Sequence, residues 1–404
     1  GYTSETDASK LLVGLGIPLD AHEKNMSTLA PGMKLRVLLA QALFGNPEIL
    51  LLDEPTNNLD LETINWLENI LIKSNSTIIM ISHDRQFLNK TCSHIADLDY
   101  GEIRLYSGNY DDFMIAATQA REYLLNENRK KEAKINELKA FVKRFSANAS
   151  KAKQATSRAN QINKIKLDDI AKSSRVYPFI RFNQKKKIHG NVLEVKNLTK
   201  SYESLQILNK INFIVDVGDR IAILGANGIG KTTLLQCLIN ENFKDNGIVK
   251  WSSNANVAYF EQNIDSNFEN KMTLMKWMGQ WVTKDEDDQK VRSILGRLLF
   301  TKDDINKTTN VLSGGEKRRM MFGKIILQEP NVIIMDEPTN HLDMESIEAL
   351  NSALDSYEGT IIFSSHDREF ISSLATRAME IKDYKIIDHN ANFIENLDQI
   401  KIDK

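Results

Sequence analysis

The stretch GANGIGKT, from Gly225 to Thr232, decides the fold. The apolar run Arg220–Leu224 (RIAIL) precedes it, and the helical pattern TLLQCLIN follows it. Strand, glycine-rich loop and helix in this order are the setting in which GxxxxGK[ST] forms a phosphate-binding loop. Its backbone N–H groups surround phosphate oxygens beside a helix N-terminus, whose partial positive charge favours anions. The sequence therefore predicts an α/β fold with a nucleotide site.

The chemistry of this loop indicates ATP and Mg²⁺ as cofactors. Lys231 is placed to bridge the β- and γ-phosphates, and the hydroxyl of Thr232 is placed to coordinate Mg²⁺. The residues predicted to contact ATP here are Gly225, Ala226, Asn227, Gly228, Ile229, Gly230, Lys231, Thr232 and Thr233.

A second apolar run, NVIIM, ends in Asp336 and Glu337. An aspartate at the carboxyl end of a buried strand is expected to be the other Mg²⁺ anchor. Glu337 beside it is placed to polarise the attacking water as a catalytic base. A strand end that runs into a solvated turn is the alternative. The recurrence of the same motif elsewhere in the chain favours the catalytic interpretation.

Three further side chains are candidates for the same site. His366 follows the run TIIFSS and is predicted to hold the γ-phosphate as a catalytic residue. Gln262, in AYFEQ, is predicted to contact Mg²⁺ or the water, and Tyr202 to stack on adenine. A lone histidine is more often structural, and an aromatic residue in a strand is usually part of the core.

The chain contains an internal repeat with a shift of 283 residues. Residues 50–60, LLLDEPTNNLD, match residues 333–343, IIMDEPTNHLD, and the segment SHDR occurs at 82–85 and again at 365–368. One ungapped shift over this length indicates duplicated domains. The first copy thus predicts Mg²⁺ binding by Asp53 and catalytic roles for Glu54 and His83.

The shift leaves Lys231 without a counterpart. Residues 1–110 are therefore expected to be the C-terminal part of a first domain that has no phosphate loop here, and residues 191–404 a complete second domain. Short apolar runs in both copies are typical of fully buried parallel strands covered by helices. Besides Arg220–Leu224 these runs are Glu48–Leu52, Thr77–Ile81, Val332–Met335 and Thr360–Phe363.

Residues 111–190, between the copies, are expected to form a basic helical hairpin linker. Residues 121–187 contain 19 Lys and Arg against 6 Asp and Glu, a net charge of +13, which leaves −15 for the rest of a chain of net charge −2. Helical spacing recurs from Ile135 to Phe145 and again from Ala152 to Ile162, with the polar turn SANAS between. The simplest interpretation is that the charged side chains form a helix face exposed to solvent. A hairpin that inserts among phosphates would explain why the positive charge is concentrated in this segment while the rest of the chain is negative.

Composition excludes several classes of protein. Two cysteines, Cys92 and Cys237, lie far apart outside any CxxC spacing, which argues against a disulfide framework or zinc site and fits a reducing, cytoplasmic setting. No apolar run approaches the roughly 18 residues that cross a bilayer, so we expect a soluble protein without stable membrane insertion.

These motifs resemble those of the ABC ATPases. The segment LSGGE at Leu312–Glu316 resembles their signature loop, which implies ATP contacts by Ser313, Gly314 and Gly315 to the site of the opposite domain in an intramolecular pair. The equivalent loop of the first copy, Leu29–Met33, departs from the pattern. Ala30 replaces the serine and Pro31 lacks an N–H, while Gly32 keeps its own. A lost charge-assisted hydrogen bond would weaken γ-phosphate binding by about 1.5–3 kcal/mol.

The whole architecture resembles the ABC-F family, and its YbiT-like branch in particular. The resemblance rests on tandem ATPase domains, an inter-domain helical hairpin and the absence of a membrane domain. It also rests on the runs APGMKLRVLLAQALF and RFSANASKAKQATSRA. The resemblance implies an ATPase that binds the ribosome near the tRNA exit site, with linker 121–187 directed toward rRNA and tRNA as a translation factor. A ribosome-protection factor for antibiotic resistance, a transporter's nucleotide-binding subunit and a nucleic-acid-binding structural protein remain alternatives.

Overall fold

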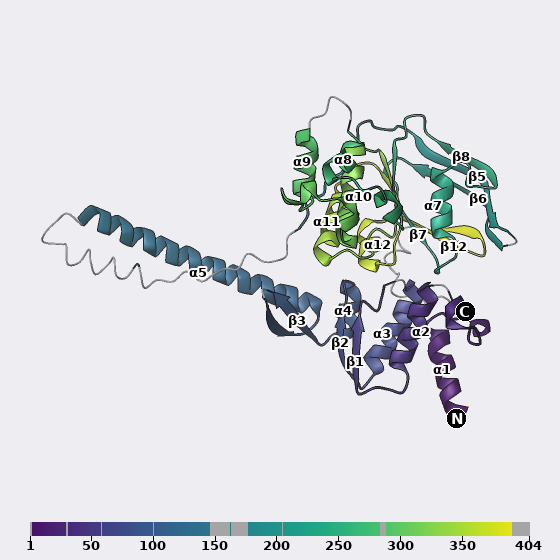
Figure 1. Ribbon diagram of the computed structural model, residues 1–404, viewed down its shortest axis with the longest axis horizontal. Coiled ribbons are helices and arrows are strands. Elements are labelled where there is room, and N and C mark those ends of the chain that lie inside the picture. The colour runs from purple at the N-terminus through teal and green to yellow at the C-terminus, as the bar shows by residue number, and fades with distance from the viewer. Residues whose placement is uncertain are drawn as a thin grey trace. The chain divides into compact units, whose positions relative to one another are not determined.

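The computed structural model describes residues 2–29, 31–57, 59–99, 101–145, 162, 177–203, 205–282 and 288–389. Two compact units divide the chain. One combines residues 1–87 with residues 176–404, and the other spans residues 88–175. Figure 1 shows the elements of each unit as ribbons.

A six-stranded sheet forms the centre of the second ABC-like copy, in the order β13-β12-β7-β11-β10-β9. All neighbours pair in parallel except β12 and β13. Because β11 lies between β7 and β10, the carboxyl ends of these three strands meet at one edge. The strands are β7 (Arg220–Leu224), β9 (Val257–Phe260), β10 (Val332–Asp336), β11 (Thr360–Ser364), β12 (Arg377–Lys382) and β13 (Lys385–His389).

A three-stranded antiparallel sheet, β6-β5-β8, packs beside the first one around helix α7. Its core contains Val195 from β5, Ile221 from β7 and Leu234 from α7. At Gly247 a Cβ would lie 2.5 Å from the carbonyl oxygen of Asn197, so the turn into β8 requires glycine. The elements are β5 (Asn191–Tyr202), β6 (Leu205–Asp216), β8 (Asn246–Trp251) and α7 (Lys231–Ile239).

Helices cover the other face of the six-stranded sheet, with Trp277 and Phe322 fully buried among them. Side-chain caps fix where three of these helices begin: Ser313 for α10, Asp343 for α11 and Asp367 for α12. The helices are α8 (Leu274–Gly279), α9 (Asp288–Arg297), α10 (Gly314–Gln328), α11 (Met344–Asp355) and α12 (Arg368–Leu374), and the short 3-10 turns are η3 (Asp265–Phe268), η4 (Asp304–Asn306) and η5 (Thr309–Val311).

The first copy contributes a two-stranded parallel sheet with helices on one face. Leu50 and Leu52 of β1 are buried against helix α3, where Leu67 is also buried. The elements are α1 (Tyr2–Gly14), η1 (Leu19–Ala21), η2 (Met26–Thr28), α2 (Pro31–Leu43), β1 (Ile49–Asp53), α3 (Leu61–Lys73), β2 (Thr77–Ile81) and α4 (Arg85–Thr91).

The prediction of fully buried strands is confirmed in the second copy and wrong in the first. Every residue of β10 and β11 is buried. By contrast, Leu51 of β1 is 70% exposed and Ile79 of β2 is 61% exposed. The reason is that the described residues 2–87 place helices against only one face of β1 and β2. Side chains therefore alternate between buried and exposed in β1, and between half-buried and exposed in β2.

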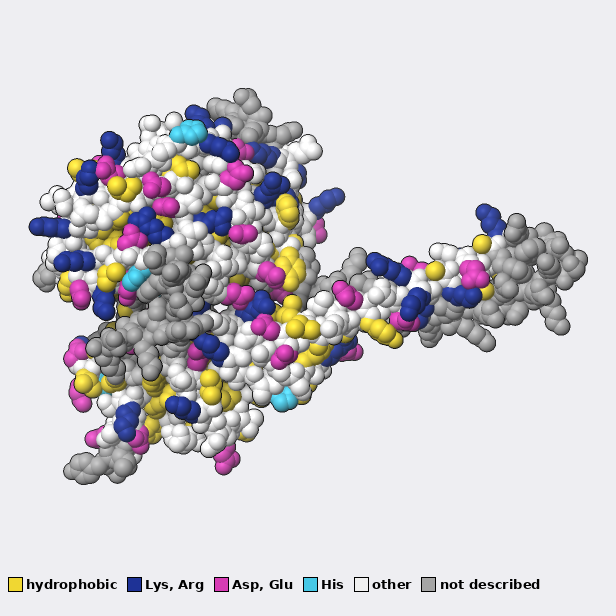
Figure 2. Space-filling view, turned by 180° about the vertical axis from the view of Figure 1, so that it is seen from behind, with side chains coloured by type: hydrophobic (Ala, Val, Ile, Leu, Met, Phe, Trp, Pro, Cys, Tyr) yellow, Lys and Arg dark blue, Asp and Glu magenta, His cyan; other side chains and the backbone are white. Residues whose placement is uncertain are grey.

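The other unit contains the hairpin β3 (His94–Asp99) and β4 (Glu102–Ser107), followed by the long helix α5 (Tyr110–Phe145). The helix predicted over Ile135 to Phe145 is confirmed as the last part of α5. The turn SANAS and the second predicted helix lie outside the described residues, except for Ile162, which is helical. Figure 2 shows Lys and Arg side chains mixed with Asp and Glu along the described part of α5. None of the described helices is long and apolar enough to span a membrane.

Candidate nucleotide-binding site

The glycine loop has a backbone that only glycine fits well. Gly225, Gly228 and Gly230 all have positive φ, at 140°, 81° and 115°. A Cβ on Gly230 would lie 2.4 Å from Cγ2 of Ile207, and one on Gly225 would lie 3.0 Å from the carbonyl oxygen of Ile381. The loop therefore closes tightly against β6 and β12 and ends at Gly230, which caps α7. This arrangement directs the N-terminus of α7 at the site where phosphates are predicted.

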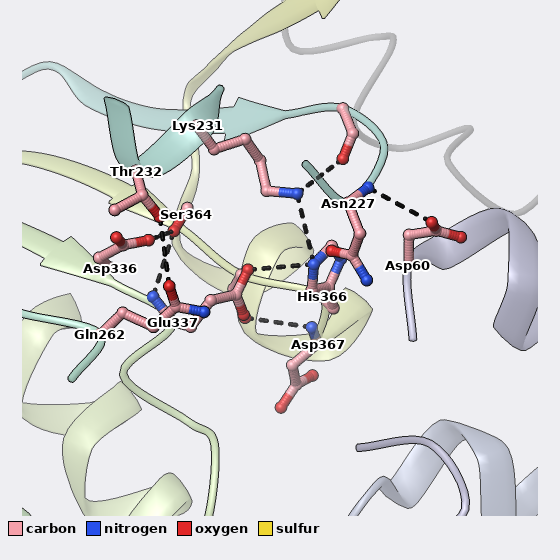
Figure 3. Close-up of polar contacts among 12 residues, drawn as sticks. Asp60, Asn227, Lys231, Thr232, Gln262, Asp336, Glu337, Ser364, His366 and Asp367 are labelled. Carbon is pink, nitrogen blue, oxygen red and sulfur yellow. Dashed lines mark hydrogen bonds and ion pairs between the residues drawn. The ribbon is translucent and has the colours of Figure 1, made fainter. Parts of the chain in front are cut away.

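Lys231 is buried and turned back over its own loop (Figure 3). Its Nζ donates to the carbonyl oxygens of Gly225 and Ala226, at 2.8 and 3.3 Å, and lies 3.4 Å from Nε2 of His366. Burial lowers the pKa of Lys231, and the nearby carboxylate of Glu337 opposes this shift. The sequence prediction that Lys231 and His366 serve one site therefore agrees with their separation.

Oxygen atoms suited to a hard cation gather at the carboxyl end of β10. Ser364 donates from Oγ to Oδ1 of Asp336 at 2.6 Å, and Oδ2 of Asp336 is buried without a hydrogen-bond partner among the described residues. Thr232 donates from Oγ1 to Oε1 of Gln262 at 3.3 Å beside it (Figure 3). Burial raises the pKa of Asp336. Hydroxyl, amide and carboxylate oxygens are ligands that Mg²⁺ accepts, so these residues fit the predicted ion.

Glu337 follows directly, with its backbone in the left-handed region at φ 48°. Its N–H donates to the carbonyl oxygen of Ser364 at 3.1 Å, and its side chain is only 4% exposed. A left-handed glutamate costs free energy, and such strain is often kept at functional sites. Glu54, the equivalent residue of the first copy, has the same conformation at φ 46°. Both copies therefore preserve the backbone that aims this carboxylate.

Glu337 and His366 lie in direct contact. Oε1 of Glu337 lies 3.2 Å from Nε2 of His366. Burial raises the pKa of Glu337 to about 7, and burial together with the charge of Lys231 lowers the pKa of His366 to about 3. Neither carboxyl oxygen of Glu337 has a well-formed hydrogen bond among the described residues. Glu337 can therefore accept a proton near neutral pH, which a base acting on water requires.

The equivalent site of the first copy keeps this geometry but is more open. Nε2 of His83 lies 3.4 Å from Oε1 of Glu54, and the backbone N–H of His83 donates to Oε2 at 3.4 Å. The Glu54 side chain is 21% exposed, against 4% for Glu337. Asp53 is exposed, whereas Asp336 is buried. The first copy thus places its predicted residues together in a wetter environment.

Asp60 and Arg36 join this site, although the sequence analysis did not select them. Oδ2 of Asp60 accepts from the backbone N–H of Asn227 at 3.4 Å (Figure 3). It also accepts from Nη2 of Arg36 at 3.4 Å. Oδ1 of Asp60 caps α3 through the N–H and hydroxyl of Thr63. In the sequence, Asp60 is the last residue of the repeated segment LLLDEPTNNLD, and this repetition could have indicated a role for it. Ser364 was also missed. The feature that could have indicated it is the serine at this position, where the first copy has Ile81.

The remaining predicted contact residues come from both copies. Ser313 caps α10 through a capping box with Glu316, and Gly314 begins that helix with no heavy atom within 4 Å of a would-be Cβ. Gly32 lies in the first turn of α2, and Ala30 lies outside the described residues. Tyr202 is 46% exposed, with its ring edge-on to Phe243. An exposed ring at this position is available for stacking.

Sequence comparisons place this geometry in a family. An ABC transporter family model matches residues 3–57 and 208–340, and a second model with the same description matches residues 96–182. "Probable ATP-binding protein YbiT" of Escherichia coli O157:H7 is 59% identical over 98% of this chain and 75% of the relative. "ABC transporter F family member 2" of Arabidopsis thaliana is 33% identical, over 95% of this chain and 57% of the relative. The chain belongs to the ABC-F family.

Other similarities agree with this ABC-F assignment. "Uncharacterized ABC transporter ATP-binding protein YkpA" of Bacillus subtilis (strain 168) is 45% identical over 100% of this chain and 75% of the relative. A solved structure of an archaeal ribosome recycling factor, aABCE1, with ribosomal stalk protein aP1 matches at a TM-score of 0.65 over 97% of this chain and 70% of that one. At 19% identity this match shows the fold alone. The α/β ABC ATPase fold and the YbiT-like ATP-binding family predicted from the sequence are confirmed.

Proposed function

We propose that this ABC-F chain hydrolyses ATP at the site built by residues 191–404. In this proposal residues 1–110 are the C-terminal part of a first ABC domain, which pairs with the second, and residues 111–190 form a helical hairpin linker. Two contacts between the copies support the pairing, because Arg85 lies 3.0 Å from Glu369 and Arg368 lies 3.7 Å from Glu68. The shift of 283 residues maps Arg85 onto Arg368. Each SHDR arginine thus reaches the other copy.

The hydrolysis proposal assigns roles from the contacts described above. Lys231 binds the β- and γ-phosphates, and His366, held neutral by burial, contacts the γ-phosphate. Glu337 takes a proton from the attacking water, since its carboxyl is buried, has no hydrogen-bond partner among the described residues and has a pKa of about 7. Thr232, Gln262 and Asp336 would hold Mg²⁺, which neutralises phosphate charge when bound.

The cellular task follows from the linker, and we propose that it is ribosome binding near the tRNA exit site as a translation factor. The observation that carries this proposal is the charge of +13 on residues 121–187 against −15 on the rest of the chain. A segment with such an excess is attracted to phosphate-rich RNA, and each phosphate contact releases counterions. Family membership supports the same task.

One experiment tests both parts of this function. Glu337→Gln together with Glu54→Gln should block proton transfer to the carboxylates while leaving ATP bound, so that the chain comigrates with ribosomes only when ATP is present. Neutralising the lysines and arginines of residues 121–187 should abolish this comigration. The matched control is Glu23→Gln with Glu348→Gln, two exposed glutamates whose loss changes the net charge equally. Absence of comigration at low salt, with recruitment to membranes instead, would favour a transporter subunit.

A further inference from the structure

Toward the end of the linker, residues 177–183 form an extended run whose side chains alternate between core and solvent. Ile180 and Phe182 are buried in the helical core, and Phe182 meets the ring of Tyr357 edge-on at 6.3 Å. Tyr177 and Phe179 point outward and are 47% and 58% exposed. Outward side chains in an extended run repeat about every 6.6 Å. The packing of the inward residues therefore holds two aromatic rings on the surface in a fixed register.

Arg297, the last residue of α9, lies against this run, and two of its guanidinium nitrogens have no acceptor among the described residues. Its carbonyl oxygen accepts from the N–H of Phe179 at 2.8 Å, and its guanidinium carbon lies 4.6 Å from the centre of the Phe179 ring. Nε and Nη2 of Arg297 are buried without a hydrogen-bond partner among the described residues. Burial and the neighbouring charge of Arg181 lower the pKa of Arg297. An anion bound beside Arg181 and Arg297 would offset the repulsion between their charges.

The run continues into a basic hollow of about 360 Å³. Lys185 and Lys186 line it, and neither forms an ion pair within the part of the chain that the structure describes. The amide of Asn331 fixes its floor, since Nδ2 donates to the carbonyl oxygens of Lys186 and Asn254 at 3.0 and 2.9 Å. Lys187, by contrast, pairs with Glu358 at 3.1 Å. Residues 177–186 thus combine exposed rings with cations that have no ion-pair partner among the described residues.

We propose that residues 177–186 and Arg297 form a binding strip for single-stranded RNA. Phosphates would accept from Arg181, Arg297 and the lysines of the hollow, while bases would stack on the exposed rings. An acidic peptide would explain the cations but not the two outward aromatic rings. Alternating rings and cations are the means by which proteins hold single strands through stacking and backbone charge. The proposal rests on the proposed function, because it names one RNA-contacting surface within linker 121–187.

Fluorescence anisotropy with a labelled 12-nucleotide oligouridine tests the rings. Tyr177→Leu with Phe179→Leu keeps apolar bulk and removes the aromatic faces. It should weaken binding by roughly tenfold or more, because each stacked base contributes about 1–3 kcal/mol. Crosslinking with 4-thiouridine RNA should label Tyr177 or Phe179. Binding that is unchanged in this variant, or equal binding of polyglutamate, overturns the strip.

The salt dependence tests the hollow with a matched control. Lys185→Gln with Lys186→Gln should reduce the slope of log affinity against log salt by about 1.4, at roughly 0.7 per phosphate of a single strand. Lys187→Gln with Lys290→Gln removes the same charge from lysines already paired with Glu358 and Glu329 and should leave the slope nearly unchanged. If the two double variants change the slope of log affinity against log salt equally, the proposed strip is wrong.

Ribosome sedimentation separates this proposal from the proposed function. If oligouridine binding does not depend on the strip while ATP-dependent ribosome binding persists, the strip is wrong and the ribosomal function stands. If the strip binds RNA as described but the chain does not comigrate with ribosomes, the ribosomal function is wrong and the strip stands. If oligouridine binding does not depend on the strip and the chain does not comigrate with ribosomes, both the strip and the ribosomal function are wrong.

Discussion

The ammonium of Lys231 lies 3.4 Å from Nε2 of His366. The lysine begins α7 after β7, and the histidine follows β11, so the carboxyl ends of two adjacent strands deliver both to one point (Figure 3). Because burial lowers the pKa of His366 to about 3, the imidazole is neutral and Nε2 can accept from the lysine. Phosphate oxygens are stronger, charge-assisted acceptors. ATP binding is therefore expected to replace this contact rather than to enter beside it.

Lys231→Met should remove most of the affinity for ATP. The loss of a charge-assisted hydrogen bond costs about 1.5–3 kcal/mol, which corresponds to a fall in affinity of roughly ten- to a hundredfold. The measurement is the shift in melting temperature with added ATP, since a ligand that binds only the folded state stabilises it. Lys250→Met, at an exposed position of β8, is the control and should keep the shift. Equal shifts in both variants would place the phosphates elsewhere.

Glu337→Gln should separate ATP binding from ATP turnover. The amide preserves the shape of the side chain but cannot accept a proton from water, so turnover should fall by about a hundredfold or more. ATP-induced stabilisation should remain. Phosphate release and the melting shift are measured on the same sample, with Glu348→Gln as the exposed control. Turnover within twofold of the unsubstituted chain would exclude Glu337 as the base.

His366 gives stability a pH dependence of predictable sign. Its pKa is about 3 in the fold, mainly because of burial, and 6.5 is the ordinary value. Between these values the unfolded chain binds a proton that the folded chain does not, so the contribution of His366 is complete above pH 6.5 and is lost as pH falls toward 3. One proton accounts for at most about 1.4 kcal/mol per pH unit.

His366→Asn should therefore reduce the fall in melting temperature between pH 7.5 and pH 4.5. The comparison at pH 7.5 is the internal control, because the imidazole is neutral in both states there and only the packing differs. A constant difference between the two chains at every pH would show that the buried imidazole does not supply this dependence.

Local sequence patterns predicted the parts of the site that one segment builds by itself. The loop from Gly225 to Thr232 and the segments containing Asp336 and His366 each carry their own spacing, and the structure brings these three segments together. Burial was harder to predict. Ile79 and Ile362 sit in equally apolar runs, yet one is 61% exposed and the other 1%. The difference depends on what covers each face, which no single run encodes.

Contacts between distant segments could not be read from the sequence for the same reason. Asp60 looks like an ordinary helix cap, and it does cap α3. The same carboxylate also contacts Arg36 and the backbone N–H of Asn227. These contacts depend on how α2, α3 and the glycine loop pack together. Ser364 likewise gains its role only because β11 lies beside β10.

The buried pair Arg36–Asp60 supplies a last test. Both side chains are largely buried, at 9% and 13% exposure, and Nη1 of Arg36 also donates to the carbonyl oxygen of Leu15. Asp60→Asn keeps an oxygen that can cap α3 but leaves the guanidinium buried without its carboxylate. Removing one partner of a buried pair costs about 3–5 kcal/mol, whereas replacing both costs much less. Asp60→Asn should speed hydrogen exchange of the backbone amides in α3, and the double variant Arg36→Met/Asp60→Asn should restore slow exchange. Asp20→Asn is the control. Asp20 forms an exposed pair with Lys24, so its loss should leave exchange in α3 unchanged. Failure of the double variant to recover would mean that the cap or the Asn227 contact, rather than the charge of Arg36, accounts for the loss.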